Sequence, residues 1–144
     1  MAIVCLLSGC LSRNSEPYSM YPLVYSSVIT SAMDNQASGL TAMLDAMDSY
    51  ISGDIDAVQA ADYIARSRCR LDVAFSQVNS LLAPEGRESS HEKLLAGSAR
   101  YIEASSTFED SLKRMDEQEV GTGFRLLDEA DSLINQASEE FKVE

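Results

Sequence analysis

Residues 89–115, SSHEKLLAGSARYIEASSTFEDSLKRM, decide the fold of this chain. Core-forming residues recur in this stretch in steps of three and four, which is the period of an α-helix that buries one face. The recurring residues are His91, Leu94, Ser98, Tyr101, Ser105, Phe108, Leu112 and Met115. The stretch therefore predicts one long amphipathic helix over 89–115, with Ser89 or Ser90 capping its start.

Three further stretches repeat this period, over residues 21–52, 55–82 and 117–141. Their connections are short, and the sustained period-2 runs that indicate strands are missing. Because short connections make consecutive helices antiparallel neighbours, the sequence predicts an all-α, antiparallel up-down four-helix bundle over residues 21–144.

Each of these stretches has its own predicted core stripe. The first stripe consists of Tyr25, Ile29, Met33, Gln36, Leu40, Met43, Met47 and Tyr50. The second consists of Val58, Ala61, Ile64, Ala65, Leu71, Phe75, Val78 and Leu82. The fourth helix contributes Phe124, Leu127, Ala130, Ile134, Ala137 and Phe141.

Acidic residues are the expected caps of two helices. Asp54 is placed to cap the second helix and Asp116 the fourth. Gly121 and Gly123 weaken the first turns of the fourth helix, so a start near Thr122 is an alternative to a start at residue 117.

The composition bounds the class of protein. With 144 residues, 45% of them hydrophobic and 24% charged, the chain suits one folded domain. Eleven Lys and Arg residues against 23 Asp and Glu residues give a net charge of -12. This charge argues against nucleic-acid binding, which depends on neutralising phosphates, and against electrostatic docking on anionic lipid.

The chain opens with MAIVCLLSGC, an apolar stretch that ends in LSGC at residues 7–10. This motif resembles the lipobox of prokaryotic lipoproteins, which reads Leu, a small residue, Gly or Ala, and then Cys. In that family the signal peptide is cleaved before the cysteine, whose thiol carries diacylglycerol and holds the protein outside the cytoplasmic membrane. The resemblance implies that residues 1–9 are a truncated-looking signal-peptide remnant and that Cys10 is lipidated.

No Lys or Arg precedes Cys10, although signal peptides begin with a basic region. We therefore expect either that the given start lies inside a longer reading frame or that the motif is accidental. In the second case the chain would be a cytosolic helical adaptor. Residues 10–20 are predicted to be the lipidated cysteine and a polar tether. Residues 17–33 lack charge but contain two prolines and many hydroxyl groups, so no membrane span is predicted there.

The chain from Leu82 onward carries a second pattern, made of a proline turn, a helix reading H..LL.....Y..A, an acidic turn and a Leu/Ala helix. Its positions are Pro84, His91, Leu94, Leu95, Tyr101, Ala104, Phe108, Met115, Asp116, Leu127, Ala130, Leu133 and Ala137. This pattern resembles extracytoplasmic helical domains of bacteria and archaea that often follow a lipobox or a transmembrane helix. These domains are largely of unknown function, so the resemblance implies fold and placement but no activity.

Residues able to carry chemistry are few. Glu88 and His91 have the ExxH spacing of di-iron bundles, but such a site needs two of these motifs and the chain has one histidine. A ligand- or metal-binding site near His91 stays open as an alternative function, beside simple packing of His91 in the core. Haem held by His91 and a methionine is a weaker alternative, because the candidate methionines occupy core spacing: Met33, Met43, Met47 and Met115.

Cys69 lies among three arginines, which could favour a thiolate. We expect Cys69 instead to be a small buried hydrophobic residue, and the arginines, Arg66, Arg68 and Arg70, to pair with the acidic helices. No disulfide, cofactor or metal is predicted, and no motif of nucleophilic catalysis is present in the sequence.

The charge pattern of the first helix is the least ordinary feature. Residues 17–44 contain a single charged residue, Asp34. Three tyrosines cluster at the start of this segment: Tyr18, Tyr21 and Tyr25. The pattern is open to two interpretations: a partner or self-association surface, or contact with membrane headgroups, on one side, and a hydroxyl-rich helix covered by its neighbours on the other. The sequence thus predicts a non-enzymatic, lipid-anchored cell-surface bundle that acts as an interaction or structural module.

Overall fold

The computed structural model describes residues 22–142, which form four α-helices and no strand. The prediction of an all-α chain with four helices is confirmed. The helices are α1 (Pro22–Ile51), α2 (Ala57–Asn79), α3 (Glu88–Arg114) and α4 (Glu117–Lys142). The predicted signal remnant, Cys10 and the tether lie outside the described residues.

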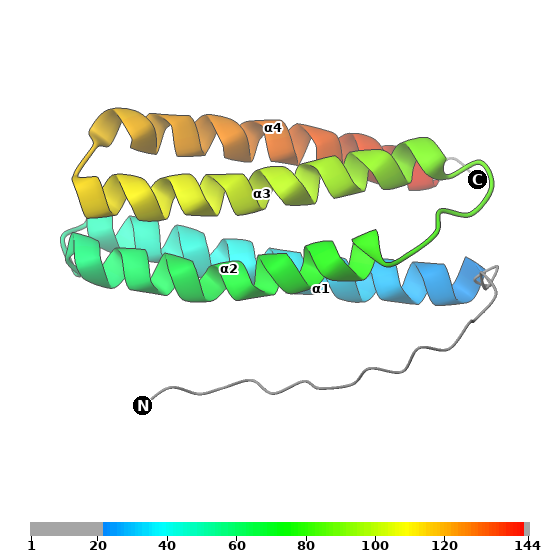
Figure 1. Cartoon of the computed structure of the whole chain (residues 1–144), viewed down its shortest axis with the longest axis horizontal. Coiled ribbons are helices and arrows are strands. Elements are labelled where there is room, and N and C mark those ends of the chain that lie inside the picture. Colours follow the sequence, from blue (N-terminus) through cyan, green and yellow to red (C-terminus); the bar gives the residue numbers. More distant parts are fainter. Residues whose placement is uncertain (1–21, 143–144) are drawn as a thin grey trace.

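Helix α3 is the central element of the described chain. It packs along α4 and α2, and it touches α1 at a few points. Within residues 22–142 the backbones of α1 and α4 do not come into contact. Figure 1 shows the helices lying lengthwise beside one another, with the α1–α2 and α3–α4 connections at one end and the α2–α3 connection at the other. The stretch with the clearest sequence period is therefore the helix that lies between α4 and α2.

The residue that caps the start of α2 is not the predicted one. Asp56, not Asp54, is the cap: its carboxylate accepts from the Gln59 N–H at 2.8 Å, and the Gln59 side chain accepts from the Asp56 N–H at 3.1 Å. Because α2 begins at Ala57, Asp54 lies two residues before the cap position, and its own N–H still donates to the Ser49 carbonyl at the end of α1. Gly53, with φ +81°, provides the left-handed turn in the connection between α1 and α2.

The start of α3 has no side-chain cap. Arg87 occupies the cap position, and Ser89 and Ser90 lie inside the first turn, so the prediction that either serine is the cap is wrong. Ser90 instead donates its hydroxyl to the Glu140 carboxylate of α4 at 2.9 Å. The serine therefore joins two helices rather than ending one.

The start of α4 confirms Asp116 as its cap. The Asp116 carboxylate accepts from the N–H groups of Gln118 and Glu119 at 3.1 and 3.2 Å. The helix begins at Glu117, so the alternative start near Thr122 is wrong. Two backbone donors satisfied at once outweigh the helix-breaking tendency of the nearby glycines.

The core follows the predicted stripes, with four departures, three of which lie at helix ends. Val58 and Leu82 are 69% and 63% exposed, Met115 is 80% exposed, and Phe124 is 39% exposed. Leu82 and Met115 lie beyond the last helical residues of α2 and α3, where the helical period no longer applies. The fully buried large side chains come from the first three helices: Met43, Met47, Ile64, Leu71, Val78, Leu94 and Phe108.

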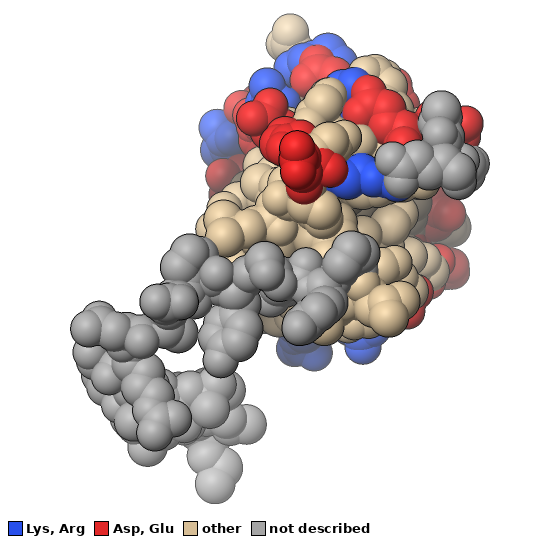
Figure 2. All heavy atoms as spheres, turned by 90° about the vertical axis from the view of Figure 1, so that its right-hand side faces the viewer, with Lys and Arg blue, Asp and Glu red and all other residues tan. Residues whose placement is uncertain are grey.

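Charge is unevenly distributed over the described surface. Figure 2 views the end of the molecule next to the α2–α3 connection, where charged side chains gather over the α3–α4 half and the α1–α2 half is mostly uncharged. Helix α1 accounts for this contrast, because its only charged residues are Asp34, Asp45 and Asp48. Among residues 22–142 no helix has the length and hydropathy needed to cross a membrane.

Candidate functional site

A buried hydrogen bond between Tyr25 and His91 joins α1 to α3. The Tyr25 hydroxyl lies 2.8 Å from His91 Nδ1, and the two side chains are 5% and 7% exposed. The Phe141 ring of α4 packs 6.4 Å from the Tyr25 ring, so three helices meet at this point. The histidine thus lies in the core, as its packing interpretation predicts.

Burial sets the protonation of this pair. Burial raises the pKa of the Tyr25 phenol, with Arg87 opposing the rise. Burial also lowers the pKa of His91, with Glu92 opposing the fall. At neutral pH the phenol is protonated and the imidazole is neutral, which allows Nδ1 to accept from the hydroxyl.

This contact corrects one part of the predicted partner surface. Tyr25 does not lie on an open face, because its ring is enclosed by α3 and α4 and its hydroxyl is bonded to His91. Tyr18 and Tyr21, the other two residues of that prediction, lie outside the described residues.

The first turns of α3 form ion-pair and aromatic contacts with α4. Lys93 pairs with Glu140, and this hydrogen bond holds the pKa of the Glu140 carboxyl below its usual range. Arg87 donates to the Glu140 carbonyl at 3.1 Å and lies 5.5 Å from the Phe141 ring centre. Across residues 22–142, no group of three or more His, Cys, Asp or Glu side chains is arranged to hold a metal ion.

Two further polar contacts cross the interior. Gln36 on α1 accepts from the Ser98 hydroxyl on α3 at 2.7 Å, with the two side chains buried. Tyr101 on α3 donates to the Asp131 carboxylate on α4. Burial, and then this hydrogen bond, raises the pKa of Tyr101 far above its usual value, so the phenol stays protonated.

Helix α2 is joined to α3 by one arginine of the cluster around Cys69. Arg68 pairs with Glu109 at 2.7 Å, and Lys113 pairs with the same carboxylate at 2.5 Å. The Lys113 hydrogen bond, supported by Arg68, lowers the pKa of Glu109 against the opposing effect of burial. The prediction that this cluster pairs with acidic helices is confirmed for Arg68, but it is wrong for Arg66 and Arg70, which form no ion pair with a described carboxylate.

Cys69 is exposed, so the prediction that it is buried is wrong. The buried face of α2 runs through Ile64, Ser67, Leu71 and Ala74. Cys69 lies two positions from Ser67 and from Leu71, which places it on the opposite side of the helix. Its thiol faces solvent.

The Tyr25–His91 pair predicts a pH-dependent stability. Because the pKa of His91 is lower in the folded chain than its ordinary value of 6.5, the unfolded chain binds more protons near and below that pH. Stability is therefore present above pH 6.5 and falls as the pH is lowered from there toward the folded pKa, by at most about 1.4 kcal/mol per pH unit. Urea unfolding at pH 7.5, 6.5 and 5.5 measures this slope.

The matched variant for this measurement is His91→Gln, which removes the titrating group and keeps a polar side chain. Its stability should change less between pH 7.5 and 5.5 than that of the parent chain, because the lowered pKa values of Glu109 and Glu140 act at more acidic pH. An equal slope in the two proteins would assign the effect to another group.

Neither a family model, a curated protein nor a solved structure matches this chain.

Proposed function

We propose that this chain is a lipid-anchored protein held outside the cytoplasmic membrane, and that it acts as an interaction or structural module rather than as an enzyme. The anchor is a diacylglyceryl group on Cys10, joined to the helical domain by the polar tether of residues 10–20. Two acyl chains supply the affinity that stable residence at a membrane requires. The helical domain is an antiparallel up-down four-helix bundle, an arrangement favoured by its short connections.

The proposal that this protein is not an enzyme rests on the contacts of its buried titratable side chains. His91 is bonded to Tyr25, Tyr101 to Asp131, and Glu109 to Arg68, and each bond joins two helices. Catalytic acids and bases must instead reach a substrate held in a cleft. These groups support a role in fixing the shape of the domain.

The outward face of α1 is the proposed partner surface. Its hydroxyls on Ser27, Thr30 and Thr41 donate to carbonyls of their own helix at 2.9–3.0 Å. Such hydroxyls lose little when water is removed, because their donors are already satisfied. With few charges to desolvate, this face suits contact with another protein or a second copy of the chain.

Processing at Cys10 tests the anchor. Expressed from its native gene context in a bacterial host, the protein should enter the membrane fraction and begin at Cys10 with added diacylglycerol, as read by intact-mass spectrometry. Cys10→Ser should abolish the modification and release the protein from membranes. Cys69→Ser is the matched control, since it removes the exposed thiol of the helical domain, and it should remain anchored. An unmodified Cys10 in a soluble protein would contradict the proposal and would favour the alternative, a cytosolic helical adaptor.

A further inference from the structure

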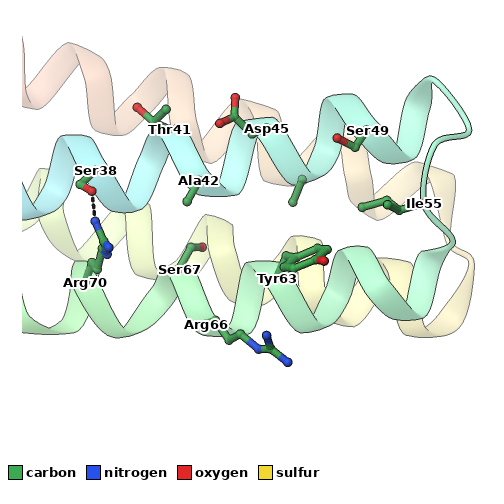
Figure 3. Close-up of a pocket in the computed structure, with 11 residues that line it drawn as sticks. Ser38, Thr41, Ala42, Asp45, Ser49, Ile55, Tyr63, Arg66, Ser67 and Arg70 are labelled. Carbon is green, nitrogen blue, oxygen red and sulfur yellow. Dashed lines mark hydrogen bonds between the residues drawn. The ribbon is translucent and has the colours of Figure 1, made fainter.

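A groove of about 850 Å³ lies between α1 and α2 (Figure 3). Its inner surface includes Ala46 and Ser67, two small and buried side chains. Ile55 lies at the end next to the α1–α2 connection. Farther along the two helices Gly39 lies tightly against α2, where a Cβ would be 2.9 Å from the Leu71 side chain. Small side chains thus form the inner surface of the groove, whereas at Gly39 the two helices pack closely.

The two edges of this groove differ in hydrogen-bonding character. Arg66 and Arg70, one turn apart on α2, supply exposed guanidinium donors. Thr41 and Asp45 line the α1 edge and point away from α2 in Figure 3. The Asp45 carboxylate only accepts hydrogen bonds, and the Thr41 hydroxyl donates to the Ala37 carbonyl at 2.9 Å, which leaves its oxygen as an acceptor.

The two groove arginines differ from most other described cations. Arg70 bonds to the neutral Ser38 hydroxyl, and Arg66 lies 5.9 Å from the Tyr63 ring centre. Ion pairs with carboxylates are formed instead by Arg68, Lys93, Arg100, Lys113, Arg114 and Arg125. Arg66 and Arg70 form no ion pair with a carboxylate of residues 22–142, which leaves both guanidinium groups available to an external anion.

We propose that the α1–α2 groove binds a small molecule that carries a phosphate or carboxylate on a hydroxylated skeleton, as sugar phosphates and sugar acids do. The oxyanion pairs with Arg66 and Arg70 on the α2 edge. Hydroxyl groups of the skeleton donate to Asp45 and Thr41 on the α1 edge. This site goes beyond the proposed function and does not depend on acylation of Cys10.

Titration of the ¹⁵N-labelled 144-residue chain, followed by amide chemical shifts, tests the site. The probes are glucose 6-phosphate, glucuronate, glucose and inorganic phosphate. Saturable shifts confined to residues 38–49 and 63–70 are expected with glucose 6-phosphate or glucuronate, and which of the two binds more tightly identifies the oxyanion. Glucose and inorganic phosphate, which each lack one half of the proposed ligand, should bind at least about tenfold more weakly.

Charge-matched variants assign the binding to the groove. Arg66→Gln combined with Arg70→Gln should weaken binding by about tenfold or more. Arg100→Gln combined with Arg125→Gln removes the same charge from α3 and α4 and should leave affinity unchanged. The proposal is overturned if neither charged probe shifts the groove amides at millimolar concentration, or if the groove variant binds like the parent. Equal affinity for glucose or for phosphate alone would overturn it as well.

Discussion

Replacing Phe108 with alanine should lower the free energy of unfolding by about 3–5 kcal/mol. The Phe108 ring is 0% exposed on the central helix and packs edge-on against the Phe124 ring at 5.0 Å. Alanine removes this contact and leaves a cavity between α3 and α4, and rigid helices on either side can only partly collapse into it. Urea unfolding followed by circular dichroism measures the loss.

Two variants bracket this result. Phe108→Leu keeps most of the apolar volume and should cost clearly less than alanine. Val73→Ala, at a position 49% exposed on α2, should stay within about 0.5 kcal/mol of the parent. A Phe108→Ala loss no larger than that of Val73→Ala would mean that the α3–α4 contact contributes little to the fold.

Two glycines in the first turns of α4 should respond to alanine with opposite signs. At Gly123 an added Cβ would lie 2.5 Å from a ring carbon of Phe108, a buried side chain with little freedom to move. Gly123→Ala should therefore destabilise the chain by about 1–3 kcal/mol. At Gly121 an added Cβ meets nothing within 4 Å, so Gly121→Ala should stabilise α4 by up to about 1 kcal/mol through helix propensity.

The two substitutions are matched in chemistry, in helix and in position along the first turns, so propensity cancels in their difference. A double-mutant cycle identifies the steric cause: in the Phe108→Leu background, Gly123→Ala should cost less than in the parent. Equal effects of Gly121→Ala and Gly123→Ala on the urea midpoint would contradict the close approach of α4 to the Phe108 ring.

The sequence was sufficient for the helices because their period depends on spacing alone. The residues that recur in steps of three and four are all buried: His91, Leu94, Ser98, Tyr101, Ser105, Phe108 and Leu112. The pattern was weakest at helix ends, where the path of the backbone decides burial. Met115 continues the spacing of α3, yet its φ of 54° takes the chain out of the helix and leaves the side chain in solvent.

The candidate sites were less predictable, because they depend on which helices meet. Tyr25 and His91 are 66 residues apart, and a tyrosine in a charge-poor segment looks the same in sequence whether it faces a partner or a buried imidazole. The α1–α2 groove did leave a signal in the i, i+4 spacing of Arg66 and Arg70. An acidic helix lies opposite Arg68 but not opposite these two arginines. This difference depends on how the helices pack, and residue spacing in the sequence does not show it.

The helices differ in how many neighbouring helices they pack against, and this difference affects how the domain unfolds. Along its backbone α4 rests on α3 alone, whereas α3 packs along both α4 and α2. A fluctuation that lifts α4 would uncover the α3–α4 interface while the three remaining helices kept their mutual contacts. We therefore expect a graded route to unfolding, in which amide hydrogens of α4 exchange with water before those of α3.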